Sequence, residues 1–333
     1  HEAVALAESM LQESLEVTTP AENTQMKRVG QLVRSPRAKS LSMLMTDRLF
    51  RSSTAGRTAK GWRAILNQVG IGEGFGLWDR MQLRLGAMAS MFLPGTVMHL
   101  VRRRLRNEAR DVILSAEEPH LTDHLANRCR DGVGLNLNQL GEAVLGEEEA
   151  GRRLDALLVL LKRPDVDYVS VKISAIFSQI NLVAPETTLK SIKDRLRLLY
   201  RAALPKRKFV NLDMEEYRDL SLTVAAFREL LDEPAFKKLP AGLVLQAYLP
   251  DSIAVQQELT AWARSRVAAG GERIKVRLVK GAYWDTEIKE SQQLGVEGYP
   301  VYTRKASTDV AYLACARFLL SDATKGRIFP QFA

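Results

Sequence analysis

With 333 residues, the chain is long enough to bury a sizeable core, in one large domain or two medium-sized ones. Its hydrophobic content of 46% and charged content of 26% are ordinary for a soluble globular protein. The first residues do not show the pattern typical of a signal peptide, and the two cysteines, Cys129 and Cys315, give neither a CxxC pair nor a disulfide framework, so we expect a reducing cytoplasmic compartment.

The formal net charge of +9 is concentrated near the amino end. Between Lys27 and Arg63 the lysines and arginines are opposed only by Asp47. Such a stripe suits phosphates or anionic lipid, but it is more often a solvated face. Because no recognition motif accompanies it, we expect no nucleic-acid binding, although a basic helical module for nucleic acid or membrane stays an alternative.

Residues 1–132 show a helical pattern broken by short polar links, which predicts a helical arm followed by an all-helical domain. Within it, Leu85–Val101 carries no charge but is shorter than the roughly 20 residues of a membrane span. Pro94 and Gly95 also interrupt this stretch. We therefore expect a buried hairpin of two helices here.

After Gly132 the pattern changes, and we place the domain boundary there. Strand-like segments now alternate with helical ones about every forty residues, and the strands are expected at 133–137, 168–173, 209–212, 243–247, 274–279 and 327–332. This alternation indicates right-handed crossovers and a parallel sheet, so residues 133–333 are predicted to have an α/β fold.

Each predicted strand ends in polar or charged residues, which are Asn138 and Glu142, Lys172, Asp213, Gln246, Arg277 and Lys280, and Gln331. Strand ends are often polar simply because they approach water. That explanation does not account for this mixture of lysine, aspartate, glutamine and arginine. The carboxyl ends of the strands form the active-site face of a β/α barrel, and we expect these side chains to converge there.

The chemistry of this face is limited by the absence of histidine after residue 132, which removes the commonest general base and metal ligand. Three cations oppose the carboxylates, so no metal site is expected. A flavin fits better, because its pyrophosphate needs cations, its ribityl chain needs groups such as Asp213 and Gln246, and its ring packs on aromatics such as Tyr283 and Trp284. Another barrel oxidoreductase that uses flavin or nicotinamide stays an alternative.

Several long sequence motifs support a more specific assignment. They are Leu140–Ala143, Val171–Ser174, Asn211–Asp219, Leu245–Asp251, Arg277–Asp285, Gly298–Val301, Thr303–Lys305 and Tyr312–Cys315. In these stretches the chain closely resembles the proline dehydrogenase domain of the bifunctional flavoenzyme proline utilization A. The helical region from about Leu41 to Arg130 resembles the helical domain that precedes it in that family.

The resemblance implies a TIM-like β/α barrel that oxidises L-proline to 1-pyrroline-5-carboxylate. Hydride would pass to N5 of FAD, and a quinone would reoxidise the flavin. It also implies a cytoplasmic protein, and it leaves open both peripheral association with the inner face of the membrane and a following aldehyde dehydrogenase domain.

Family analogy assigns a role to each site residue. Arg277 would lie near flavin N5, and Gln246 and Asp213 would bond the flavin. The cofactor would be cradled by Lys280, Gly281, Ala282 and Trp284, and its phosphates would be met by Arg304 and Lys305. Lys172 would pair with the proline carboxylate, Tyr283 would shape the pocket, and Glu142 would orient a cation.

Two departures from the family pattern affect these expectations. Asn138 stands where some members have aspartate. The chain also stops at Ala333, before the last two strands of the family barrel and the helix whose paired arginines hold the substrate. We therefore expect a barrel that is incomplete at its C-terminal end, an exposed sheet edge and weak activity from these residues alone.

Overall fold

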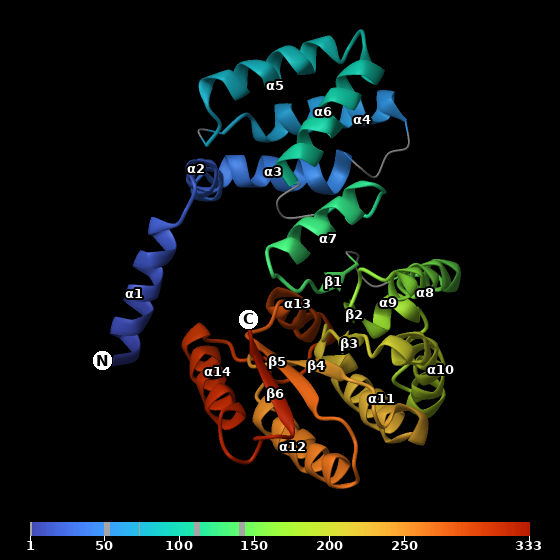
Figure 1. The fold of residues 1–333 in the computed structure, drawn as a ribbon. Helices are drawn as coiled ribbons and strands as arrows, with labels where there is room; N and C mark the ends of the chain where they lie inside the picture. The colour runs from blue at the N-terminus through green and yellow to red at the C-terminus, as the bar shows by residue number, and fades with distance from the viewer. Residues whose placement is uncertain (1, 50–53, 73, 110–113, 140–143) are drawn as a thin grey trace. The chain divides into compact units, whose positions relative to one another are not determined.

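The computed structural model describes residues 2–49, 54–72, 74–109, 114–139 and 144–333. It divides into two compact units, His1–Ala116 and Glu117–Ala333 (Figure 1). The division lies upstream of the predicted domain boundary at Gly132, which stays a prediction.

The first unit is built from helices, as the sequence pattern predicts. They are α1 (Glu2–Glu16), α2 (Pro20–Arg34), α3 (Pro36–Leu49), α4 (Ala55–Val69), α5 (Leu77–Ala89) and α6 (Pro94–Ala109). The start of α2 is well capped, because Thr19 and Glu22 form a reciprocal capping box and Pro20 occupies the first turn.

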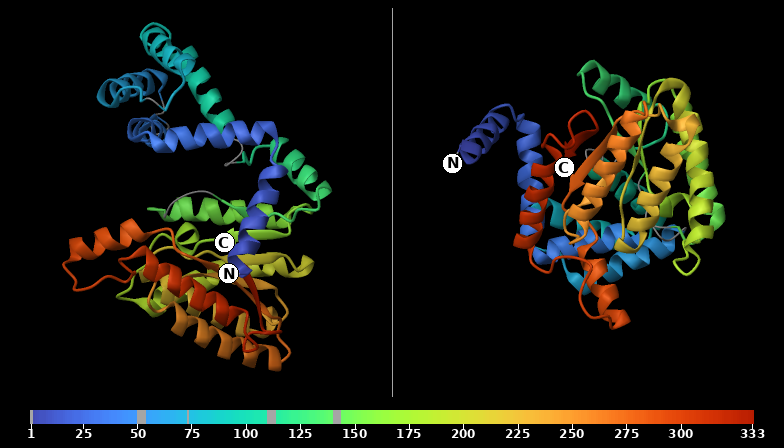
Figure 2. Two further views of the ribbon diagram at one scale, coloured as in Figure 1. Left: turned by 90° about the vertical axis from the view of Figure 1, so that its left-hand side faces the viewer. Right: turned by 90° about the horizontal axis from the view of Figure 1, so that it is seen from below.

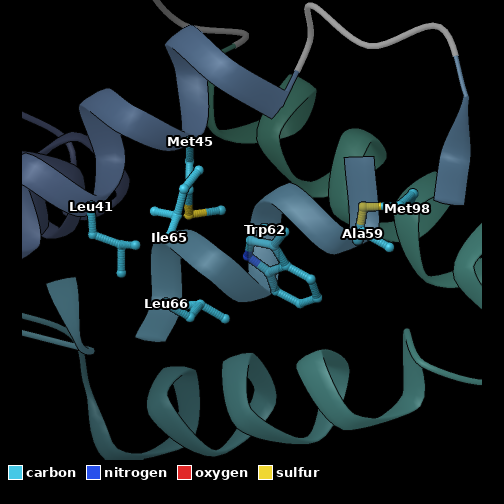
Figure 3. Close-up of a cluster of buried hydrophobic side chains, with 7 residues drawn as sticks. All are labelled: Leu41, Met45, Ala59, Trp62, Ile65, Leu66 and Met98. Atoms are coloured by element: carbon cyan, nitrogen blue, oxygen red, sulfur yellow. The ribbon is translucent and has the colours of Figure 1, made fainter. Parts of the chain in front are cut away.

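The core of this unit forms around Trp62 of α4, which is only 1% exposed (Figure 3). Leu41 from α3 and Met98 from α6 belong to the same buried cluster. The predicted hairpin of α5 and α6 is present, but the prediction that it is buried is wrong, since Phe92 is 82% exposed. Only one side of each helix packs on the core, so the rest of this apolar stretch faces outward. No helix in the described ranges has both the length and the hydropathy needed to span a bilayer.

The second unit alternates strands with helices. Its strands are β1 (Leu137–Asn138), β2 (Tyr168–Val171), β3 (Phe209–Leu212), β4 (Ala241–Gln246), β5 (Ile274–Val279) and β6 (Ile328–Phe332). Its α-helices are α7 (His120–Arg130), α8 (Glu147–Lys162), α9 (Ile173–Ile176), α10 (Pro185–Ala203), α11 (Leu220–Asp232), α12 (Ser252–Ala268), α13 (Trp284–Leu294) and α14 (Lys305–Leu319). Short 3₁₀ helices lie at Leu204–Lys206, Tyr217–Asp219 and Pro234–Phe236.

The strands pair in chain order, β1 to β6, and every pair is parallel. Helices α8, α10, α12 and α14 contact the sheet from its outer side, as Figure 1 and the right-hand view of Figure 2 show. This arrangement confirms the predicted parallel α/β fold with strands followed by covering helices.

Side chains alternate across the sheet, and β5 shows the alternation most clearly. Ile274, Val276 and Leu278 are buried, whereas Lys275 and Arg277 lie on the opposite, inner face. The Nζ atom of Lys275 lies 4.4 Å from the ring centroid of Phe209 and 4.6 Å from that of Tyr168. The apolar side chains of the strand point to the outer face, where the helices pack on them. The inner face is therefore left to polar and charged groups.

Two elements differ from the sequence-based expectation. The first strand is limited to Leu137–Asn138, at the end of the predicted segment. The sequence pattern also predicts a longer loop between the fifth strand and the helix that follows it, but helix α13 occupies this region. Its only buried residues are Glu287 and Ser291, so it presents no apolar stripe for a periodicity argument to detect.

The turn after β5 is fixed by Gly281, which has φ +128°, a conformation that residues with a side chain rarely adopt. A Cβ atom placed here would lie 2.5 Å from Cγ of the Tyr248 ring. The Tyr248 amide in turn donates to the Lys280 carbonyl over 2.8 Å. Only glycine allows this close approach of the turn to the ring.

We predict that Gly281→Ala destabilises the second unit more than Gly270→Ala does. Gly270 also has a positive φ of +81°, but a Cβ there would meet nothing within 4 Å. The control should therefore cost only the backbone strain, about 1–2 kcal/mol. Gly281→Ala should cost about 1–3 kcal/mol more because of the overlap with Tyr248. Urea unfolding followed by circular dichroism measures the difference, and equal losses would contradict the packing argument.

The loop from β3 to α11 carries a buried carboxyl, Asp219, which is 3% exposed. Burial raises its pKa to about 6, and the carboxylates of Glu216, Glu215 and Glu287 act in the same direction, while Arg218 opposes them. The folded state therefore binds a proton that the unfolded state has already released at pH 5. This proton binding stabilises the fold at low pH, and the contribution is lost as the pH rises through about 6.

We predict that Asp219→Asn reduces this pH dependence and increases stability above pH 6. The asparagine stays neutral, so the gain should be roughly 3 kcal/mol at pH 7, which follows from the shift of the pKa from 3.8 to about 6. Unfolding free energies measured from pH 4 to pH 7.5 for both proteins provide the comparison. An unchanged slope in the variant would show that Asp219 is not the titrating group.

Candidate active site

Asp213 lies at the end of β3, where side chains from three strands meet its carboxylate. Arg277 of β5 forms an ion pair with Oδ1, and Asn211 donates to the same oxygen over 3.0 Å. Asn138 of β1 donates to Oδ2 over 2.9 Å. Both oxygens are thus occupied, and the Arg277 and Asp213 side chains are only 16% and 11% exposed. The predicted convergence of Asn138, Asp213 and Arg277 is present.

A second carboxylate, Glu215, joins further parts of the site. Its Oε1 lies 3.4 Å from Lys172 Nζ and accepts from the Tyr283 hydroxyl over 3.1 Å. Ser174 donates to Oε2, and Gln246 Nε2 donates to the Glu215 backbone carbonyl over 2.9 Å. These contacts link the ends of β2, β3, β4 and β5.

Burial keeps the Tyr283 hydroxyl protonated. Its pKa is raised well above the usual value near 10, first by burial and then by the negative charge of Glu215 and the hydrogen bond to it. The neutral hydroxyl therefore donates to Glu215 and fixes the orientation of the ring.

Several buried polar atoms at this face lack a partner within the described part of the chain. They include Oε1 of Gln246, whose residue is 2% exposed, and Nε of Arg277, as well as Oδ1 of Asn211 and Oε1 of Gln331. The arginine nitrogen is a donor and the three oxygens are acceptors. The edge of an isoalloxazine ring carries both donors and acceptors, so the residues present fit a flavin.

A separate cluster lies where β5 ends and α14 begins. Lys280 Nζ donates to Asp309 over 2.6 Å, and Lys305 Nζ donates to its other oxygen over 2.7 Å. Asp309 raises the pKa of Lys280, and the two lysines lower the pKa of Asp309. Arg304 precedes Lys305 and is exposed. Two lysines therefore meet one carboxylate at the amino end of α14, with Arg304 next to them in the chain, and this excess of positive charge favours a further anion.

Not all of the predicted site residues fall into one group. Trp284 is 40% exposed, and its indole nitrogen donates to the Tyr302 carbonyl over 2.9 Å. Ala282 is exposed beside Gly281. Glu142 lies outside the described residues, so its predicted role stays a prediction. Gln331, on the inner side of β6, pairs in register with Arg277.

Sequence reasoning did not assign a role to Glu215, although it follows Asp213 by two residues. That spacing puts both carboxylates in one loop at the active-site face. The signal that identifies Glu215 is its burial, at 7% exposed, and the number of groups that meet it. Neither can be obtained from a single sequence.

Comparison with known proteins places this site in context. A family model described as proline dehydrogenase matches residues 121–333. The bifunctional protein PutA of Escherichia coli (strain K12) is 40% identical over 167 residues, which are 50% of this chain and 12% of that protein. The proline dehydrogenase of Deinococcus radiodurans is 26% identical over 191 residues, 56% of each chain.

Solved structures agree with these sequence relationships. Proline utilization A (PutA) from Corynebacterium freiburgense matches with a TM-score of 0.65 and 41% identity, covering 70% of this chain and 24% of that chain. The Bdellovibrio bacteriovorus PutA matches with a TM-score of 0.66 and 30% identity, covering 89% and 31%. These matches confirm the TIM-like fold with a preceding helical region.

The chain thus spans 12% of the length of the bifunctional relative from E. coli. The family model, in contrast, covers more than half of the chain and includes all six strands. The chain belongs to the proline dehydrogenase family.

Proposed function

We propose that the protein containing this chain oxidises L-proline to 1-pyrroline-5-carboxylate with bound FAD and passes the electrons to a quinone. The observation that carries the proposal is the meeting of Lys172, Asp213, Gln246 and Arg277 at one end of a parallel sheet in a chain of the proline dehydrogenase family. The name of the relative from D. radiodurans supports the same reaction.

FAD supplies a two-electron acceptor for a hydride from the ring carbon beside the proline nitrogen. Gln246 Oε1 and Arg277 Nε would bond the isoalloxazine edge, since both are buried and without a partner in the described ranges. Lys280, Arg304 and Lys305 would face the phosphates, with Gly281, Ala282 and Trp284 beside them. A cation near the ring favours the reduced, anionic form of the cofactor.

The remaining side chains act on the substrate. Lys172 would hold the proline carboxylate, and Tyr283 would form a wall of the pocket because its ring is fixed by Glu215. The hydride leaves from the neutral amine form of proline, whose proton has been released to solvent, so neither residue has to transfer a proton for the hydride to move. Correct positioning and exclusion of water supply the catalysis, which explains why the site works without histidine.

The wider partners belong to the same proposal. We place the protein in the cytoplasm, with peripheral contact to the inner face of the membrane where a quinone is reached. The word "bifunctional" in the names of the relatives supports an aldehyde dehydrogenase domain in the complete protein.

The test uses the complete protein encoded by the reading frame. The purified protein should show flavin absorption bands that bleach when L-proline is added without oxygen. Lys172→Met should raise KM for proline about 10- to 100-fold, because a hydrogen bond between charged groups contributes about 1.5–3 kcal/mol.

Lys162→Met is the matched control, since Lys162 ends α8 on the exposed surface. It should leave KM unchanged. A purified protein without flavin, or bleaching that responds equally to both substitutions, would contradict the proposal.

A further inference from the structure

Glu215 holds a central position that the proposed reaction does not by itself require. Its side chain is 8% exposed and meets Lys172, Tyr283 and Ser174. Its backbone carbonyl accepts from Gln246. A buried carboxylate with this many donors is a fixed point, because moving it would break several charge-assisted hydrogen bonds together.

Lys172 depends on this fixed point. It follows β2 directly and precedes the short helix α9, so its backbone is set by two elements. Its side chain is flexible, and a free lysine side chain carries about 2 kcal/mol of rotamer entropy. Within the described ranges, the carboxylate that reaches Lys172 is Glu215, at 3.4 Å. Glu215 therefore orders the ammonium group before any substrate arrives.

Tyr283 depends on the same oxygen. Its hydroxyl donates to Oε1 of Glu215, the atom that also faces Lys172. The lysine just after β2 and the tyrosine beyond β5 are thus held at a fixed separation by one atom. If both contact the substrate, this separation determines where the substrate ring lies.

We infer that Glu215 is a positioning residue that sets Lys172 and Tyr283 in the geometry from which proline is oxidised. The inference rests on the proposed function. Glu215 does not touch the reacting atoms; it acts through its two partners. The negative charge of Glu215 also repels a substrate carboxylate bound at Lys172. Removing the charge therefore relieves this repulsion, which raises the affinity for proline, but it also leaves Lys172 less well positioned, which lowers the affinity. The rate of flavin reduction at saturating proline isolates the positioning effect.

Glu215→Gln keeps the size of the side chain and removes its charge. We expect the rate of flavin reduction at saturating proline to fall about 10-fold or more, because small displacements of reacting groups cost rate steeply. KM should change by less than the rate does. Glu287→Gln is the control, since Glu287 is a buried glutamate that accepts from the Tyr217 amide. It should leave the rate within about twofold.

A double-mutant cycle separates positioning from general damage. In a Lys172→Met background, Glu215→Gln should lower the rate by clearly less than it does alone, because the lysine that it positions is gone and Tyr283 is the partner that is left. Equal effects of Glu215→Gln in both backgrounds would overturn the inference.

Ser174→Ala gives a second route if Glu215→Gln fails to bind flavin. It removes one donor to Glu215 and leaves the charge, so the rate should fall severalfold; an unchanged rate would overturn the inference. In every case, bleaching of the unsubstituted protein by proline is measured first. If the unsubstituted protein does not bleach, the proposed function is contradicted. If it bleaches, but the effects of Glu215→Gln and Lys172→Met on the rate of flavin reduction simply add, only the role of Glu215 is contradicted.

Discussion

The Asp213 carboxylate is the constraint on which the inner face of the sheet depends. It receives Arg277 from β5, Asn138 from β1 and Asn211 from its own strand. A guanidinium as little exposed as that of Arg277 costs several kcal/mol when it is left without a partner. Asp213 offsets this cost and, by doing so, ties the first, third and fifth strands to a single point.

The loop that follows β3 extends this constraint outward. Glu215, two residues later, plays the same part beyond the end of the sheet, because it contacts Lys172 and Ser174 just after β2 and Tyr283 in the turn after β5. Gln246 supports the loop backbone from β4. One short segment therefore links the Asp213–Arg277 ion pair within the sheet to Lys172 and Tyr283 at its end. Coupling of this kind makes the site sensitive to small changes in the β3 loop.

The strands and the polar residues at their ends were predictable from the sequence. Apolar runs of four to six residues, repeated about every forty residues, gave the parallel sheet, and polar residues such as Lys172, Asp213 and Arg277 marked its active end. The pairing of these residues was not predictable. Arg277 and Asp213 are 64 positions apart, and nothing local in the sequence indicates that each is the other's partner. Asp213 and Asp309 meet two of the cations at this end of the sheet, Arg277 and Lys280.

Other features were missed because they have no periodic signal. Helix α13 buries a glutamate and a serine in place of an apolar stripe. The α5 and α6 hairpin was expected to be buried from its hydrophobicity, yet composition does not determine which side of a helix packs. Glu215 appeared in the sequence as one acid among several. Burial and shared contacts distinguish it, and both depend on tertiary structure.

The central claim is that residues at the ends of successive strands surround one flavin ring. A crystal structure of the complete, flavin-loaded protein with a proline analogue tests it most directly. The account predicts the isoalloxazine ring within hydrogen-bond distance of Gln246 and Arg277, and the carboxylate of the analogue on Lys172. A ring bound elsewhere, with these side chains still paired only to one another, would contradict it.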